Sequence, residues 1–131
     1  MTDIETLIQS RIRQADETLA DAETLFNAHS NARSIVNRTY YAIFYAMNAL
    51  LLKENISIQT SKHMGIIALF NKELIHKGKI DKKYSVVIHH QFEMRQKGDY
   101  KALVEISTDE AKESIREAKE FLDVIKENIV L

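Results

Sequence analysis

The chain contains no proline and only three glycines among its 131 residues. These two residues interrupt helices most strongly, so a chain almost free of them can form long, continuous helices. Apolar residues recur at steps of three and four along most of the sequence, which is the period of an α-helix, and strand-like alternation is absent. We therefore predict an all-α fold.

Five helical segments follow from this period, with boundaries expected at residues 2–28, 32–53, 60–76, 81–98 and 107–129. The second segment is apolar around most of its circumference after Tyr40, which predicts the central, most buried helix. Short connections between the segments indicate an antiparallel up-down bundle, and the length suits a single domain over residues 1–131.

Individual residues mark several boundaries. Ser107 followed three residues later by Glu110 is a capping box, which predicts a helix start. Gly78 suits the position just after a helix, and Gly98 indicates a helix stop or a kink. Gly65, inside the third segment, indicates a close helix–helix contact.

The composition excludes several classes of protein. There is no cysteine, so disulfide frameworks, thiolate catalysis and cysteine-based zinc sites are excluded. Residues 1–19 carry charged side chains throughout and no apolar signal-peptide core. The longest apolar stretch, residues 42–52, is too short to cross a bilayer. We therefore expect a cytoplasmic protein with no membrane partner.

Charge is unevenly distributed along the chain. The net charge is −1, but residues 60–101 contain nine basic and four acidic side chains, and four of the five histidines. Both flanking regions are acidic, so the middle third forms a local basic field that can attract an anion. The alternative interpretation is a solvated, lysine-rich surface.

The first candidate site segment is residues 37–44, with Asn37, Arg38 and Tyr41 as candidate anion-binding or nucleotide-binding residues. Arg38 lies on the most apolar helix, where a buried guanidinium needs several acceptors or an anion. Arg38 and Tyr41 are three residues apart and share a helix face. A phosphate would satisfy Arg38, but so would a carboxylate that locks the helix packing.

The second candidate segment is residues 89–100. Arg95 at a helix end beside Lys97 is a candidate phosphate clamp. Asp99 and Tyr100 follow Gly98 and are expected to fold back over it. The alternatives are a salt-bridge or turn role for Asp99, and a packing role for the ring of Tyr100.

No metal or cofactor is expected. His89 and His90 are adjacent and point in different directions on a helix, and His63 and His76 lack the i, i+4 spacing of a zinc helix. Phosphate-binding glycine loops and nucleophile-elbow motifs are also absent from the sequence.

Four stretches in this order resemble the HEPN superfamily, over about residues 30–125. They are Asn37-Arg38-x-Tyr40-Tyr41-Ala42-x-Phe44, Lys62-His63-x-Gly65-Ile66, the stretch from Phe70-Asn71-Lys72-Glu73 to Gly78, and Arg95-x-x-x-Asp99-Tyr100. The resemblance is closest to small stand-alone prokaryotic members.

This resemblance implies an antiparallel helical bundle that forms a homodimer. It also implies a minimal nucleotidyltransferase as partner, often in a toxin–antitoxin pair. Active members are metal-independent endoribonucleases with an R-x4–6-H motif, in which the arginine stabilises phosphate charge and the histidine transfers a proton at the 2′-hydroxyl.

The sequence departs from that motif at one position. Counting from Arg95, the expected histidine is replaced by Tyr100, and no histidine follows. A phenol, with a pKa of about 10, is a poor base at neutral pH. The tentative catalytic residues are therefore Arg95 and Tyr100, with His89 or His90 as substitutes for the missing imidazole. Arg38 is expected to complete the anion site with Arg95.

Three functions remain open at this point. The preferred one is a nucleotide-handling or RNA-handling protein of a toxin–antitoxin system, with endoribonuclease activity as its extension. The second is a non-catalytic interaction or dimerisation module, in which Tyr100 is a regulatory hydroxyl modified by the nucleotidyltransferase. The third is a structural bundle in which Arg38 only stabilises packing.

Overall fold

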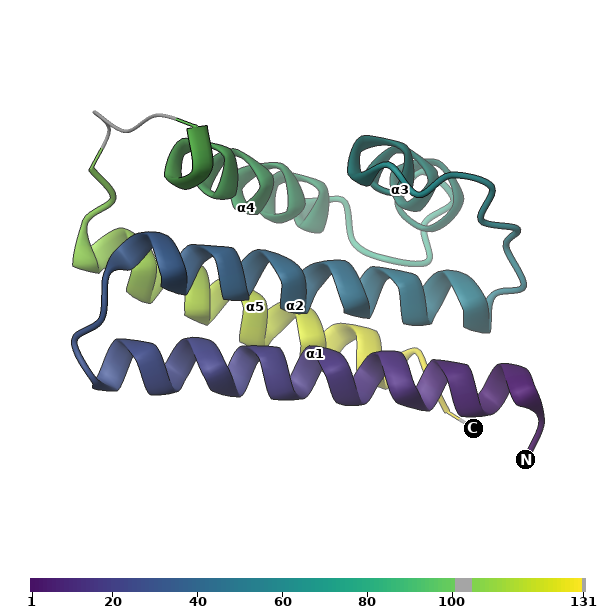
Figure 1. Ribbon diagram of the computed structural model, residues 1–131. Helices are drawn as coiled ribbons and strands as arrows, with labels where there is room; N and C mark the ends of the chain where they lie inside the picture. The colour runs from purple at the N-terminus through teal and green to yellow at the C-terminus, as the bar shows by residue number, and fades with distance from the viewer. Residues whose placement is uncertain (101–104, 131) are drawn as a thin grey trace.

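The computed structural model describes residues 1–100 and 105–130, with Tyr100 described only as a helical position. Its elements are α1 (Asp3–Asn27), α2 (Ala32–Lys53), α3 (His63–Phe70), the π-helical turn η1 (Asn71–Ile75), α4 (Lys83–Tyr100) and α5 (Thr108–Glu127) (Figure 1). No strand occurs among these residues, and the predicted all-α bundle is confirmed.

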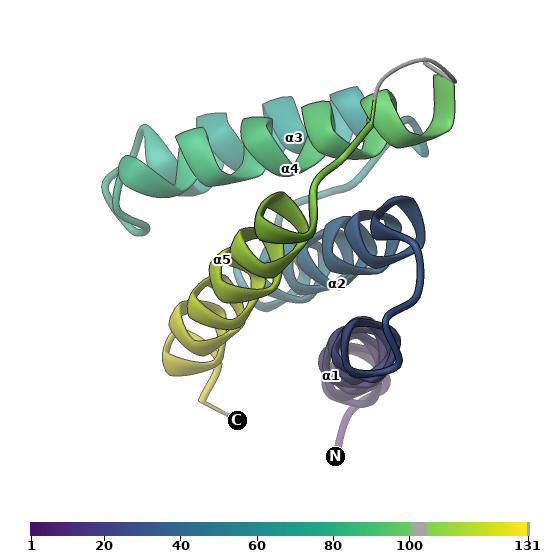
Figure 2. The same cartoon turned by 90° about the vertical axis from the view of Figure 1, so that its left-hand side faces the viewer.

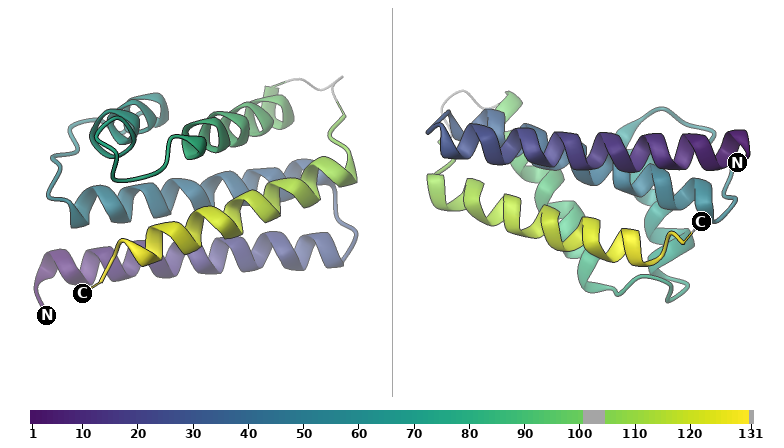
Figure 3. Two further views of the ribbon diagram at one scale, coloured as in Figure 1. Left: turned by 180° about the vertical axis from the view of Figure 1, so that it is seen from behind. Right: turned by 90° about the horizontal axis from the view of Figure 1, so that it is seen from below.

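The helices form two layers around α2. Helix α1 runs antiparallel to α2, and α5 runs alongside both, in the same direction as α2 (Figures 1 and 3). The second layer, made by α3, η1 and α4, lies on the side of α2 opposite α1 and crosses it rather than running along it (Figure 2). The antiparallel arrangement thus holds for α1 against α2 and α5, while α2 and α5 are parallel and α3 and α4 bring side chains across one face of α2.

Helix α2 is the central helix, as predicted. It contacts α1, α3, α4 and α5, and its residues Val36, Ile43, Met47 and Leu50 are fully buried. Burial of an apolar core of this size stabilises the fold of a chain that has no cysteine for disulfide bonds. Helix α2 therefore provides a rigid support for the polar side chains at its surface.

Capping explains where three helices begin. Thr2 accepts a hydrogen bond from the Glu5 N–H at the start of α1, and Asn31 accepts one from the Ser34 N–H at the start of α2. The predicted capping box at α5 is confirmed, because Ser107 and Glu110 bond each other's backbone N–H groups.

The third predicted segment begins later than expected. Thr60 lies in the preceding loop, where its hydroxyl accepts from the Lys62 N–H, and α3 begins at His63. A Cβ atom on Gly65 would lie 2.7 Å from Cγ2 of Thr60, so the close contact at Gly65 is with this loop and not with another helix. Gly78 has φ +76°, which confirms its predicted position after a helical segment.

Of the two alternatives predicted for Gly98, a helix stop or a kink, the stop is wrong, because α4 continues to Tyr100. Gly98 is buried, and a Cβ there would lie 3.4 Å from Cδ1 of Ile106 and 3.5 Å from Cγ of Arg33. The glycine thus lies where α4 packs closely against the start of α2. None of the helices described is both long enough and apolar enough to cross a membrane.

Candidate functional site

Arg95 lies where α4 crosses α2. Its side chain is only 18% exposed, and its Cζ atom lies 5.4 Å from the ring centre of Tyr40 and 5.5 Å from that of Tyr41. Nε of Arg95 lies 3.0 Å from Oδ2 of Asp99, one helical turn further along α4. This ion pair lacks hydrogen-bond geometry, since no acceptor among the described residues lies in line with the Nε–H of Arg95. Arg95 is therefore held on an aromatic surface with part of its donor capacity unused.

His63, the first residue of α3, completes this group. Its Nδ1 atom lies 2.9 Å from the hydroxyl of Tyr40 and 3.5 Å from Nη1 of Arg95. Its ring packs on that of Phe44, with centroids 4.3 Å apart. In the sequence, His63 lies in a stretch that resembles the HEPN superfamily, but no role was predicted for it. The histidine of the R-x4–6-H motif was expected after Arg95. Only the crossing of α3, α2 and α4 shows that an imidazole lies beside that arginine.

Arg38 reaches the same aromatic surface from α2. Its Nε and Nη2 donate to Oδ1 of Asn37 at 3.1 and 2.8 Å, and its Cζ lies 5.3 Å from the ring centre of Tyr41. No carboxylate pairs with Arg38 in the part of the chain that the structure describes. The expected acid-paired packing role for Arg38 is therefore not seen there. We refer to Arg38, Tyr40, Tyr41, His63, Arg95 and Asp99 together as the arginine site.

Burial sets the protonation of two groups in the arginine site. Burial raises the pKa of the Tyr40 hydroxyl far above its usual value, and the charge of Arg95 offsets this only in part. Burial lowers the pKa of His63, and the neighbouring Arg95 charge lowers it further. At neutral pH, Tyr40 is therefore a protonated phenol and His63 is favoured as a neutral imidazole.

A cleft of about 460 Å³ adjoins the arginine site between the start of α2 and the end of α4. Its lining combines two arginines with amide, hydroxyl and carboxylate groups: Leu25, Asn31, Arg33, Ser34, Asn37, Arg38, Gly98 and Asp99. Arg33 was not singled out from the sequence, because it lies before residues 37–44, the first of the stretches that resemble the HEPN superfamily. Its position follows from the close packing of Gly98 on α4 against the side chain of Arg33.

The structure does not bring Lys97 and His90 to the arginine site. Lys97 is two residues from Arg95 and so points to the other side of α4. It lies near Glu110, whose pKa is lowered chiefly by the hydrogen bond from the Ser107 N–H and further by the charges of Lys97 and His90. The side chain of Tyr100, the other tentative catalytic residue, lies outside the described residues.

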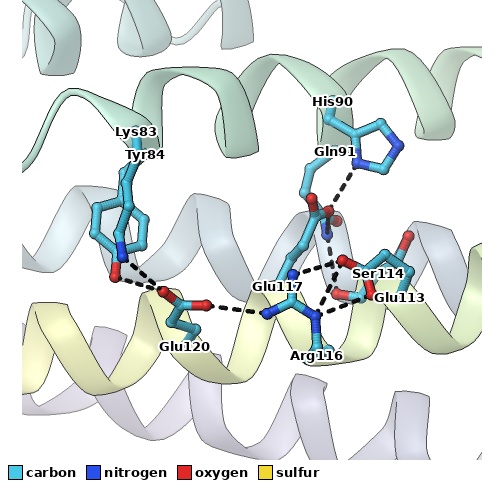
Figure 4. Close-up of polar contacts among 9 residues, drawn as sticks. All are labelled: Lys83, Tyr84, His90, Gln91, Glu113, Ser114, Arg116, Glu117 and Glu120. Atoms are coloured by element: carbon cyan, nitrogen blue, oxygen red, sulfur yellow. Dashed lines mark hydrogen bonds and ion pairs between the residues drawn. The ribbon is translucent and has the colours of Figure 1, made fainter.

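His90 belongs to a separate polar cluster between α4 and α5 (Figure 4). Its Nδ1 lies 2.7 Å from Oε1 of Glu117, an oxygen that also accepts from the buried amide of Gln91. Nearby, Glu120 accepts from the hydroxyl of Tyr84 and forms an ion pair with Lys83. These contacts join the two helices, so His90 faces α5 while Arg95 faces α2 and α3.

Within residues 1–100 and 105–130, no three histidine, aspartate or glutamate side chains are grouped so as to hold a metal ion. Apart from the carboxylate of Asp99, the polar groups of the arginine site are two guanidinium groups, phenol hydroxyls and an imidazole, a set suited to an anion rather than to a cation.

The chain is similar to known proteins over nearly its whole length. A family model described as "HEPN domain" matches residues 8–129. The chain is 41% identical to a "UPF0332 protein" of Thermotoga maritima, over 98% of this chain and 96% of that protein. It is 37% identical to "Putative toxin MJ0605" of Methanocaldococcus jannaschii, over 95% of this chain and 90% of that protein. The chain is also 31% identical to "Putative toxin MJ0142" of the same organism, over 94% of this chain and 82% of that protein.

Proposed function

The chain belongs to the HEPN domain family, and from this premise we propose that it is a toxin-like member whose arginine site binds the phosphate groups of RNA or of a ribonucleotide. The observation that carries the proposal is the convergence of two arginines on one tyrosine ring, with a single carboxylate among them. The names of the two archaeal relatives support the toxin-like assignment.

The charge balance of the arginine site favours an anion. Arg38 has a neutral amide as its hydrogen-bond partner, and among the described residues only Asp99 forms an ion pair with Arg95. Arg33 adds a third guanidinium at the adjoining cleft. Guanidinium groups match the geometry of phosphate oxygens and donate two hydrogen bonds at once. A phosphate between α2 and α4 would offset the repulsion of these cations.

A direct binding experiment tests this proposal. Fluorescence anisotropy would follow a short labelled single-stranded RNA, with unlabelled AMP as a competitor to separate an RNA ligand from a mononucleotide. We expect Arg95→Ala to weaken RNA binding at least tenfold. Arg13→Ala is the matched control, because Arg13 is exposed on α1 and its substitution removes the same charge as Arg95→Ala. Equal binding by all three proteins would refute the proposal.

Metal-independent RNA cleavage is the extension of this function. The motif arginine is present at the arginine site, and a neutral imidazole lies beside it. Incubating RNA with the purified protein in EDTA, alongside Arg95→Ala, tests the extension. Cleavage by the unsubstituted protein alone is the expected result for an enzyme. If neither protein cleaves, the function is binding without catalysis.

The family resemblance supports pairing with a minimal nucleotidyltransferase, and the toxin names of the relatives are in keeping with a toxin–antitoxin pair. Tyr100 would then be a hydroxyl that the partner modifies. Co-expression with a nucleotidyltransferase encoded next to this chain, followed by mass spectrometry, tests both points. Failure to co-purify, together with an unmodified Tyr100, would refute this pairing.

A second candidate function is a homodimerisation module, and the surface near the arginine site favours it. Met64 is 56% exposed directly after His63, and the rings of Phe44, Tyr45 and Phe92 are only partly buried. Apolar side chains gathered on one surface are typical of interfaces. Sedimentation of the Met64→Glu variant tests whether this surface forms the dimer, with Val86→Glu on α4 as the control. A dimer that survives Met64→Glu would exclude this surface.

A further inference from the structure

The neighbours of His63 determine which ring nitrogen carries its proton. Arg95 offers only hydrogen-bond donors, so the Nδ1 atom that faces its Nη1 at 3.5 Å is favoured as an acceptor. The hydroxyl of Tyr40, 2.9 Å from the same Nδ1, is then the donor. In the neutral imidazole the proton therefore sits on Nε2.

Both groups hold this arrangement at neutral pH. Burial keeps the Tyr40 hydroxyl protonated by raising its pKa, so it remains a donor. Burial and the charge of Arg95 lower the pKa of His63, so the imidazole remains an acceptor at Nδ1. Protonation of Nδ1 would place a second cation directly against Arg95.

The opposite edge of the His63 ring has no assigned role. Nε2 has no hydrogen-bond partner in the described part of the chain, and it is not among the buried polar atoms that lack partners. The ring is held in place by Phe44 and Tyr40, with centroids 4.3 and 5.6 Å away. His63 thus presents a fixed, unused N–H group beside a guanidinium.

We propose that His63 is a further ligand-binding residue of the arginine site, whose Nε2–H donates to an oxygen of the phosphate group that Arg95 binds. This inference rests on the proposed function. Tyr40 is a positioning residue, because its hydroxyl holds Nδ1 and so keeps the proton on Nε2. A donor held in position before the ligand arrives loses little entropy on binding.

This role differs from that of a general base. A base must present an unprotonated nitrogen to the hydroxyl that it deprotonates. In His63 the unprotonated nitrogen is Nδ1, which is occupied by Tyr40, whereas the outward nitrogen carries a hydrogen. His63 therefore acts on the phosphate as a donor.

Two substitutions at position 63 separate the two ring edges. In His63→Gln the side-chain amide N–H₂ lies near the former Nε2, so the donor is kept. In His63→Asn the side-chain oxygen lies near the former Nδ1, so the contact with Tyr40 is kept, but the shorter side chain places no donor at the former Nε2 position. With the labelled single-stranded RNA, we expect His63→Asn to weaken binding about tenfold, the loss of one hydrogen bond of about 1.4 kcal/mol. His63→Gln should bind within about threefold of the unsubstituted protein.

Long-range ¹⁵N–¹H NMR of the free protein tests the proton position without any ligand. The expected spectrum at neutral pH is that of the Nε2–H tautomer, and Tyr40→Phe should shift it toward a mixture of tautomers. A protonated Nδ1 in the unsubstituted protein would overturn the proposal.

The binding outcomes are distinct for the two claims. If Arg95→Ala loses RNA binding while His63→Asn binds like the unsubstituted protein, the role of His63 is refuted and the proposed function stands. If His63→Gln is as weak as His63→Asn, the Nε2–H donor is refuted. If the unsubstituted protein binds neither RNA nor AMP, the proposed function and this inference both fail.

Discussion

Arg38 and Arg95 lie over the same aromatic ring, with their Cζ atoms 5.3 and 5.5 Å from the ring centre of Tyr41. One arginine comes from α2 and the other from α4, so the crossing of these helices brings the two cations together. Like charges repel, and the face of a tyrosine ring offsets this only in part. The arrangement is therefore one that a bound anion would stabilise.

Removing the carboxylate of Asp99 should strengthen anion binding. Asp99 pairs with Arg95 and lines the adjoining cleft, so it competes with a phosphate for the guanidinium. We expect Asp99→Asn to raise RNA affinity about threefold to tenfold. It should cost no more than about 0.5 kcal/mol of stability, as expected for an i, i+4 pair.

The control for this prediction is Asp123→Asn, an exposed aspartate on α5 with no ion pair in the described part of the chain. It changes the net charge equally but lies outside the arginine site. An equal gain in affinity from both substitutions would mean that net charge alone controls binding.

Arg38→Ala should leave the stability of the protein nearly unchanged. Arg38 is only half-buried, and its contacts are the neighbouring amide of Asn37 and the ring of Tyr41. Surface substitutions of this kind change stability by about 0.5 kcal/mol or less. Urea denaturation would measure this. A loss of several kcal/mol would instead favour the structural role for Arg38 that the sequence left open.

The fold was predictable from the sequence because its determinants are local. Helix period and capping residues such as Ser107 and Glu110 act within a few residues, and they predicted the helices and the central position of α2. The end of α4 was not predictable, because Gly98 is accommodated by packing against Arg33, far away in the sequence.

The candidate site was predictable only in part. Arg38, Tyr41, Arg95 and Asp99 were named from their motifs, and the structure brings them together. His63 was missed because its proximity to Arg95 depends on how α3 crosses α2, which no local pattern records. His90 and Lys97 were included because of their sequence neighbourhood, but they point toward α5 and its start.

Stability should depend on pH through His63. Its pKa in the folded protein is lowered by burial and by Arg95 from the usual value of about 6.5, so below that pH the unfolded chain binds more protons. The stabilising contribution of the neutral imidazole is present above about pH 6.5 and is lost as pH falls through the lower folded-state pKa. Urea denaturation of the unsubstituted protein and of His63→Gln, between about pH 7 and 5, measures this contribution to the free energy of unfolding. The variant should lose less stability on acidification, and parallel curves would contradict the prediction.

Two glycine substitutions should act in opposite directions. Gly98→Ala should raise stability by about 0.5 kcal/mol, because alanine favours the helix and the new Cβ would make only van der Waals contacts, 3.4 Å or longer. Gly65→Ala should lower stability, because its Cβ would lie 2.7 Å from Thr60. Adding Thr60→Ala should restore part of the loss. Thermal unfolding of Gly98→Ala, Gly65→Ala and the double variant Gly65→Ala, Thr60→Ala measures these changes in stability. If the effects of Gly65→Ala and Thr60→Ala simply add, the contact between the two positions is contradicted.

The most direct test of the anion-binding claim is the salt dependence of RNA binding. For single strands, the slope of log affinity against log salt concentration changes by about 0.7 for each phosphate contact. We expect Arg38→Ala and Arg95→Ala each to flatten this slope by about that amount, and the double substitution to flatten it by the sum of the two. Arg13→Ala should leave the slope unchanged. A slope that is the same in the unsubstituted protein and in the double variant would contradict the account.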